Sequence, residues 1–196
     1  MTNCEKFLDY FSKYCQIYFP AIKDTQLNNP KSFEELTRIM LKWAESHIGE
    51  NWEKTLADGY LHFLMDVNRS QIEYERHGNY LNKSYSDVFN RVYNNAEFMG
   101  FYHWGVFVST FAWEHHIKIY DLYRNSFLPY LDPEGGCLLD LGSGSGIWSF
   151  LATYFSPQWT SQGIDISEKS VELSTKMALD SALSAKVSFK EYDALK

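Results

Sequence analysis

The chain has 196 residues, of which 45% are hydrophobic, 17% aromatic and 22% charged, so it can bury the core of one domain, or of one domain with a cap. Its 25 acidic and 18 basic residues give a net charge of −7, and the lysines and arginines form no run. Because binding to phosphates requires a basic surface, we expect no nucleic-acid partner.

Cysteine use and the N-terminus indicate the compartment. Cys4, Cys15 and Cys137 are odd in number and fit neither a disulfide framework nor a zinc site. They suit a reducing environment, and charges interrupt every apolar stretch near the N-terminus, unlike in a signal peptide. The longest weakly charged stretch, residues 98–113, is too short to span a bilayer. We expect a cytoplasmic protein without membrane contact.

Residues 1–131 have a helical pattern and form an expected N-terminal helical cap. Apolar residues at helical spacing predict a first helix over residues 7–18, which Pro20 is expected to end. Ser32 and Glu35 have the spacing of a capping box and predict the start of the next helix. Further helices are expected at about residues 51–76, from near Ser86, and at about residues 106–130.

Residues 132–196 change to the alternation of an α/β domain. Strands are expected at CLLDL, TSQGIDI and KVSFKEY, separated by a helix over IWSFLATYF and by a second helix that Ser167 caps. Units of this kind form parallel sheets with right-handed crossovers. We therefore expect an α/β fold: a Rossmann-like parallel sheet, incomplete with its first three strands, behind an N-terminal all-helical cap.

A glycine-rich turn follows the first strand, and acidic residues follow the next two. The turn comprises Asp140, Gly142, Ser143, Gly144 and Gly146. Glycines let a strand turn sharply into a helix and leave the main chain open to a ligand, and the free N–H groups at the helix start favour polar or anionic atoms. Asp165 stands about 20 residues further on, where a carboxylate accepts ribose hydroxyls. Asp193, after the third strand, can accept an adenine amino group.

The spacing of the glycines bears on which nucleotide binds. A dinucleotide fingerprint needs G-x-G-x-x-G, but Ile147 occupies the last position and Gly146 comes one residue early. Asp140 would repel a diphosphate, whereas a carboxylate there favours the ammonium and sulfonium of S-adenosylmethionine. The sequence therefore predicts a cationic adenosyl ligand rather than a dinucleotide.

These motifs resemble those of a known family. LLDLGSGSG resembles motif I of class I (Rossmann-like) S-adenosylmethionine-dependent methyltransferases, GIDIS resembles the ribose-binding strand end of that family, and YDA resembles its adenine-contacting element. The resemblance covers residues 136–196, about the last third of the chain.

The resemblance implies a role for each matching residue. The glycine turn lies under the methionine part of the cofactor, and Asp140 supports the turn and the ammonium group. Asp165 holds the ribose, with Ile166 against the adenine face, and Asp193 and Ala194 meet the adenine edge.

A complete sheet of this family has seven strands, and the present sequence carries only the first three. The CLLDL strand would then be an open sheet edge, which is an aggregation hazard. Three explanations stay open: the sequence is part of a longer enzyme, a second chain completes the sheet, or the N-terminal helices cover the edge. We favour the first.

Methyl transfer depends on positioning and on the exclusion of water more than on a catalytic motif. In related small-molecule methyltransferases the segment before the first strand lines the substrate site, which implies this role for FMGFYHW at residues 98–104. Tyr102, His103 and Trp104 are the substrate-site candidates, since aromatic faces suit cations. His103 is a candidate base, and Tyr102 is the second catalytic candidate. The alternative is that Tyr102 and Trp104 are core aromatics and His103 is structural.

The adjacent Glu114, His115 and His116 do not predict a metal site, because neighbouring residues on a helix point about 100° apart. The resemblance implies a methyltransferase that acts on a small molecule and releases S-adenosylhomocysteine. Two alternatives stay open: a non-catalytic S-adenosylmethionine-binding or scaffolding subunit completed by another chain, and a nicotinamide-dependent oxidoreductase.

Overall fold

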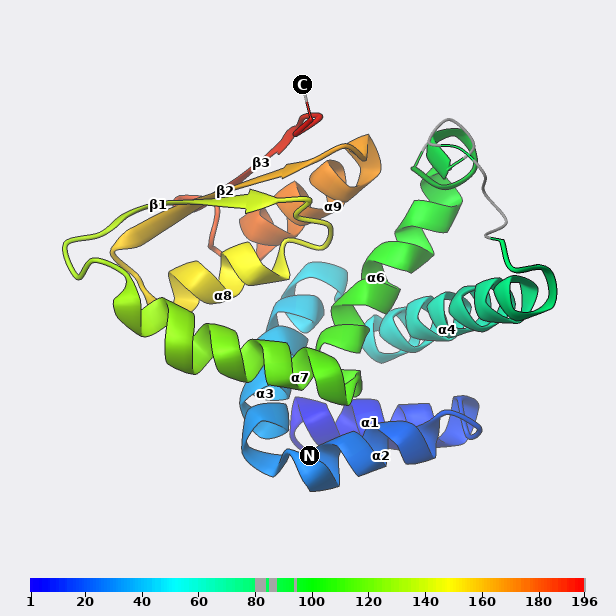
Figure 1. Ribbon diagram of the computed structural model, residues 1–196. Coiled ribbons are helices and arrows are strands. Elements are labelled where there is room, and N and C mark those ends of the chain that lie inside the picture. Colours follow the sequence, from blue (N-terminus) through cyan, green and yellow to red (C-terminus); the bar gives the residue numbers. More distant parts are fainter. Residues whose placement is uncertain (80–83, 85–87, 94, 196) are drawn as a thin grey trace.

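Helices form the first two thirds of the chain and a small parallel sheet follows (Figure 1). The computed structural model describes residues 1–79, 84, 88–93 and 95–195. The expected α/β fold with an N-terminal helical region is confirmed. The elements of this region are α1 (Asn3–Tyr14), α2 (Phe19–Asn28), α3 (Pro30–Ile48), α4 (Trp52–His77), η1 (Phe89–Tyr93), α6 (Ala96–Ala112), α7 (Glu114–Leu122), η2 (Tyr123–Phe127) and η3 (Leu128–Tyr130).

The first helices begin and end differently from the sequence prediction. Pro20 lies in the first turn of α2, where its missing N–H costs nothing, so the prediction that it ends the first helix was wrong. The capping box forms at Thr2 and Glu5 instead. Ser32 lies inside the first turn of α3 and donates a hydrogen bond of 2.6 Å to Asp121 of α7, so it caps nothing.

The expected long helix over residues 106–130 is interrupted. Trp113 adopts an extended conformation and separates α6 from α7. Its indole packs against Phe63 of α4, with ring centroids 5.4 Å apart, so tertiary packing overrides the helical pattern. The expected helix at residues 51–76 is confirmed as α4, whereas the start expected near Ser86 lies outside the described residues.

The sheet contains β1 (Gly136–Leu141), β2 (Trp159–Asp165) and β3 (Val187–Glu191), parallel and in that order. The crossover helices α8 (Ile147–Phe155) and α9 (Glu168–Asp180) lie on one face of the sheet (Figure 1). Ser167 caps α9 as expected, because its side chain accepts from the N–H of Ser170. All three strands therefore present their carboxyl ends at one edge.

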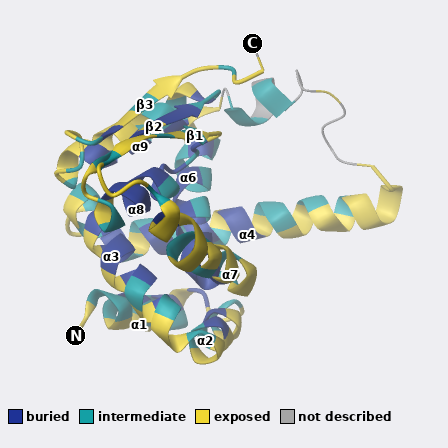
Figure 2. Ribbon diagram, turned by 60° about the vertical axis from the view of Figure 1, so that its left-hand side comes forward, coloured by how far each residue is buried: buried dark blue, intermediate teal, exposed yellow. Residues whose placement is uncertain are grey.

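The helical region packs on the α8–α9 layer, so one core extends across the expected boundary at residues 131 and 132. Trp43 of α3 contacts Phe150 of α8 at a ring distance of 5.7 Å, and His47 of α3 is bonded to Asp180 of α9 at 2.6 Å. The opposite face of the sheet stays exposed among the described residues (Figure 2). In this part of the chain, no helix has both the length and the apolar character that crossing a bilayer requires.

Candidate cofactor and substrate pocket

A cavity of about 400 Å³ lies between the carboxyl ends of the strands and helix α6. This is the edge at which open α/β sheets bind their ligands. The sequence candidates that line it are Tyr102, His103, Gly142, Gly144, Asp165, Ile166, Asp193 and Ala194. The structure thus brings six of the nine expected cofactor residues and two substrate candidates from α6 to one cavity.

The glycine turn needs its glycines for their backbone angles. Gly142, Gly144 and Gly146 have φ angles of 70°, 51° and 73°, a region that other residues rarely adopt. A side chain on Gly146 would also collide with Phe189 of β3, whose ring would lie 2.5 Å from the added Cβ. A Cβ added to Gly142 or Gly144 would meet no side chain within 4 Å, so the turn leaves room for a ligand. The N–H groups of both glycines are already bonded, that of Gly142 to the carbonyl of Ile164 and that of Gly144 to Asp165.

Asp165 holds the turn in place. Its Oδ2 accepts from the N–H of Gly144 and its Oδ1 from the N–H of Ser167, both at 2.8 Å. The carboxylate therefore joins the turn to the start of α9. Because an ionised carboxylate offers about four acceptor positions, two remain for ligand hydroxyls such as those of a ribose.

The end of β3 closes the adenine side of the expected site. The N–H of Tyr192 donates to the carbonyl of Asp165 at 2.9 Å and extends the pairing of β2 with β3. Asp193 and Ala194 follow and line the cavity. Asp193 Oδ1 accepts from the N–H of Leu195 at 3.0 Å, which fixes the carboxylate beside the pocket.

Asp140 does not line the cavity, contrary to its expected role beside the cofactor's ammonium. Side chains alternate along β1, and Asp140 lies on the face covered by α8. Its Oδ2 accepts from the hydroxyl of Ser149 at 2.8 Å, and Ser161 donates to Ser149 at 3.0 Å. Burial raises the pKa of Asp140, an effect that the bonds to Ser149 oppose. The carboxylate thus supports the strand–helix unit from the other side of the turn.

Three further candidates lie outside the lining. Trp104 is buried in the core against Gly59 of α4, where a Cβ added to the glycine would lie 2.6 Å from the Cβ of Trp104. The packing of α6 on α4 directs Trp104 away from the pocket. The expected substrate role of Trp104 therefore finds no support. Ser143 is buried, and its backbone N–H donates to the carbonyl of Ile164. Gly146 faces Phe189.

Sequence reasoning missed several residues that line the cavity. They are Tyr93, Met99, Val106, Ser145, Ile164, Ser170, Tyr192 and Leu195. Ser145, within the glycine turn, and Tyr192, beside Asp193, were adjacent to recognised motifs. Met99 and Val106 lie one turn on either side of His103 in α6, a spacing that places them on one helix face.

His103 is 2% exposed and lines the cavity, and neither ring nitrogen has a hydrogen-bond partner among the described residues. Burial lowers its pKa to about 3, with smaller contributions from the nearby His47 and Lys169. The imidazole is therefore neutral at neutral pH and can offer a ligand one donor and one acceptor. It is also a weak base there, which limits the expected role in proton abstraction.

The pocket and a hollow that adjoins it carry mostly acidic side chains. The described lining includes Asp165 and Asp193 and no lysine or arginine. An adjoining hollow of about 280 Å³, which shares Tyr93 and Ile166 with the pocket, adds three glutamates and Lys169. Lys169 is bonded to Glu172 at 2.8 Å. This arrangement favours a cationic ligand and disfavours a diphosphate.

Metal ligation has no geometric basis in the part of the chain that the structure describes, because no three histidine, cysteine, aspartate or glutamate side chains gather there. Glu114 is paired with Lys118. His116 Nδ1 donates to the carbonyl of Ser109 at 3.0 Å.

The sequence matches no family model, and a comparison with curated proteins gives no match.

Proposed function

We propose that the chain binds S-adenosylmethionine in the 400 Å³ cavity and transfers its methyl group to a small molecule. The observation that carries the proposal is the convergence of the glycine turn, Asp165 and Asp193 on a cavity whose described lining has no positive side chain. An adenosyl ligand with an ammonium and a sulfonium complements these charges. We further propose that the protein is cytoplasmic and that its partners are small molecules rather than nucleic acid or membrane.

Each part of the pocket has a distinct task in this proposal. The free space beside Gly142 and Gly144 receives the amino-acid end of the cofactor. Asp165 accepts the ribose hydroxyls, and Ile166 and Ala194 contact the adenine. The bound cofactor supplies an electrophilic methyl group, and the protein positions the acceptor and excludes water.

Tyr102 and His103 face this cavity from α6 and are the proposed acceptor contacts. Neutral His103 has one ring nitrogen that donates and one that accepts, so it can orient an acceptor that carries both a hydrogen-bond donor and an acceptor. We propose orientation rather than proton abstraction, because a group with a pKa of about 3 is a poor base near neutral pH.

A non-catalytic S-adenosylmethionine-binding subunit is the second candidate. The observation in its favour is the edge of β1, which pairs with β2 alone among the described strands. A nicotinamide-dependent oxidoreductase is disfavoured, since its dinucleotide would place a diphosphate beside the pocket's carboxylates.

Calorimetry with S-adenosylhomocysteine and with NADH tests the proposal. We expect binding of S-adenosylhomocysteine, weakened by about 1–3 kcal/mol in Asp165→Ala, the cost of losing charge-assisted hydrogen bonds. Asp165→Asn keeps the size of the side chain and one acceptor oxygen, so weaker binding by this variant is not explained by misfolding. Glu75→Gln, exposed on α4, is the control and should bind like the wild type. NADH binding without S-adenosylhomocysteine binding would reject the proposal.

A further inference from the structure

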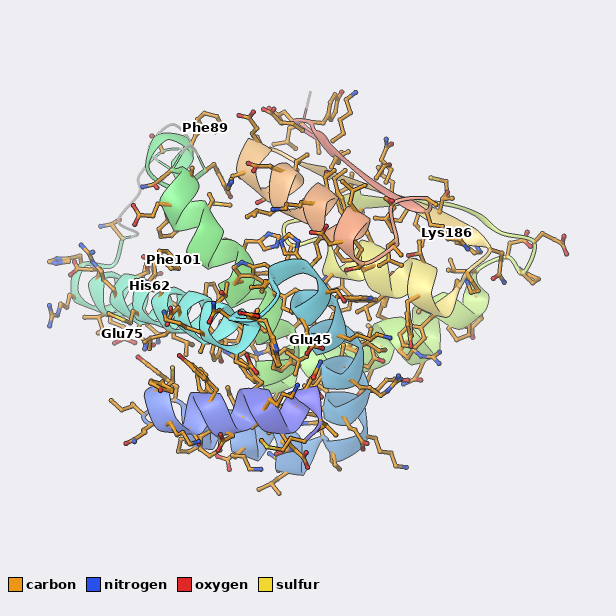
Figure 3. All side chains as sticks on the ribbon, turned by 180° about the vertical axis from the view of Figure 1, so that it is seen from behind. Glu45, His62, Glu75, Phe89, Phe101 and Lys186 are labelled. Carbon is orange, nitrogen blue, oxygen red and sulfur yellow. The ribbon has the colours of Figure 1, made fainter. Side chains whose placement is uncertain are left out.

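A second cavity, of about 420 Å³, lies between α4 and α6. We call it the α4–α6 groove; its walls include His62, Phe63, Asp66 and Arg69 from α4 and Phe101 and Tyr102 from α6. The two helices touch at two glycines. Gly59 of α4 lies against Trp104 of α6, and Gly105 of α6 lies against Phe63 of α4. The helices diverge beyond this contact (Figure 1). The groove occupies the angle between them, where Figure 3 shows His62 and Phe101 side by side.

The walls of the groove are aromatic. The rings of His62 and Phe101 stack with centroids 4.1 Å apart and an interplanar angle of 19°. Phe63 meets Tyr102 edge to face at 5.5 Å, and Phe98 stacks on Tyr102 at 5.9 Å. Flat, rigid walls of this kind suit a planar apolar ring, which gains both buried area and ring–ring contacts.

Tyr102 lines both the groove and the proposed cofactor pocket. Burial is the main cause of the raised pKa of its phenol, and Tyr93, Asp66 and Asp165 raise it further. The phenol therefore lies within electrostatic reach of a carboxylate in each cavity. Asp66 and Tyr102 both line the groove, and Tyr102 is the wall that the groove shares with the cofactor pocket.

Arg69 follows Asp66 by three residues in α4, which corresponds to about 4.5 Å along the helix axis at about 1.5 Å per residue. Among the described residues, neither Asp66 nor Arg69 has an ion-pair partner, although Lys54 pairs with Asp58 and His77 with Glu73 on the same helix. The groove thus offers a ligand a negative group and, about one helical turn away, a positive group.

We propose that the α4–α6 groove binds the methyl acceptor, and that the acceptor is an aromatic amino acid or a close analogue of one. Its ring lies among Phe63, Phe101 and Tyr102. Its carboxylate faces Arg69, and its amine faces Asp66 and is directed past Tyr102, the wall shared with the cofactor pocket. This inference rests on the proposed function. The neutral amine nitrogen forms the new N–C bond, the S–C bond breaks with its electron pair left on sulfur, and the proton lost from the amine passes through Asp66 to solvent.

Four indoles test the inference, each titrated by calorimetry into protein saturated with S-adenosylhomocysteine: L-tryptophan, tryptamine, indole-3-propionate and indole. We expect L-tryptophan to bind most tightly. Asp66→Asn should weaken tryptophan and tryptamine at least tenfold and spare indole-3-propionate, whereas Arg69→Gln should weaken tryptophan and indole-3-propionate and spare tryptamine. Glu75→Gln and Arg76→Gln, exposed charges near the end of α4, are the controls and should leave all four affinities unchanged.

The outcomes separate the two proposals. If S-adenosylhomocysteine binds and none of the indoles does, the acceptor site is rejected and the cofactor proposal stands. Binding of indoles without binding of S-adenosylhomocysteine removes the acceptor role together with the proposed function. Affinities that Asp66→Asn and Arg69→Gln leave unchanged also reject the inference. Asp66→Asn keeps the size of the native side chain and Arg69→Gln changes an exposed one, so misfolding is no alternative explanation.

Discussion

His103 has an unusual environment among the described residues, because its imidazole is buried with both nitrogens unpaired. A buried polar group without a partner costs about 1–3 kcal/mol, and both ring nitrogens of His103 lack a partner among the described residues. Asp140 and Asp165, by contrast, each hold hydrogen bonds that fix their orientation. Because His103 lines the cavity, its unpaired nitrogens have access to a ligand.

The buried imidazole should make the protein sensitive to acid. Its pKa is lowered to about 3 from a usual 6.5, so between these values the unfolded chain binds a proton that the folded chain does not. Stability is therefore lost as the pH falls through this window. Urea denaturation should show that the wild type loses about 2 kcal/mol more than His103→Leu between pH 7 and pH 4.5.

Two comparisons make this pH prediction specific. His77→Leu removes an exposed histidine at the end of α4 and should follow the wild type. Carboxylates titrate alike in all three proteins, so they cancel in the differences. Parallel pH profiles for wild type and His103→Leu would show that the imidazole is not held neutral.

At the scale of elements, the contact between α4 and α6 decides the shape of both cavities. A methyl group on Gly105 would lie 2.2 Å from Phe63 Cβ, whereas one on Gly100, five residues earlier in the same helix, meets nothing within 4 Å. Alanine improves helix propensity at both sites, so the difference between the two variants isolates the contact.

Thermal or urea unfolding of Gly105→Ala and Gly100→Ala measures that difference. Gly105→Ala should lower the free energy of unfolding by about 1–3 kcal/mol, because overpacking forces the helices apart. Gly100→Ala should raise it by about 0.5–1 kcal/mol. Equal changes in the two variants would show that α4 and α6 do not approach closely at this point.

Local signals predicted the elements that local chemistry controls. The helix IWSFLATYF begins and ends as expected at Ile147 and Phe155, and Ser167 caps α9. Predictions failed where distant contacts intervene. Trp113 breaks a helical pattern because it packs against Phe63, and no neighbouring residue in the sequence signals that contact.

The site follows the same division. Because β2 and β3 run parallel, Asp165 and Asp193, which follow them, lie at one edge of the sheet. The sequence predicted this arrangement. The direction in which Asp140 points depends on which face α8 covers, and the burial of Trp104 depends on Gly59, forty-five residues away. The α4–α6 groove depends on how two helices cross, which periodicity within either helix does not reveal.

At the scale of the whole molecule, α8 and α9, with the helical region packed behind them, cover one face of the sheet and leave the other exposed. Leu139 and Leu141 on β1 are 59% and 62% exposed. Within the described residues the outer edge of β1 pairs with no strand, so its N–H and C=O groups are open to another chain. An apolar face beside an unpaired edge promotes association.

We expect this 196-residue chain to self-associate through β1, and sedimentation velocity over a range of protein concentrations measures it. Leu139→Glu should shift the distribution toward monomer, because a charge on this face opposes the approach of a second apolar strand. Leu179→Glu is the matched control: Leu179 on α9 is equally exposed, at 61%, but lies away from the edge. A wild type that is monomeric throughout, or an equal effect of both substitutions, would show that the β1 edge attracts no partner.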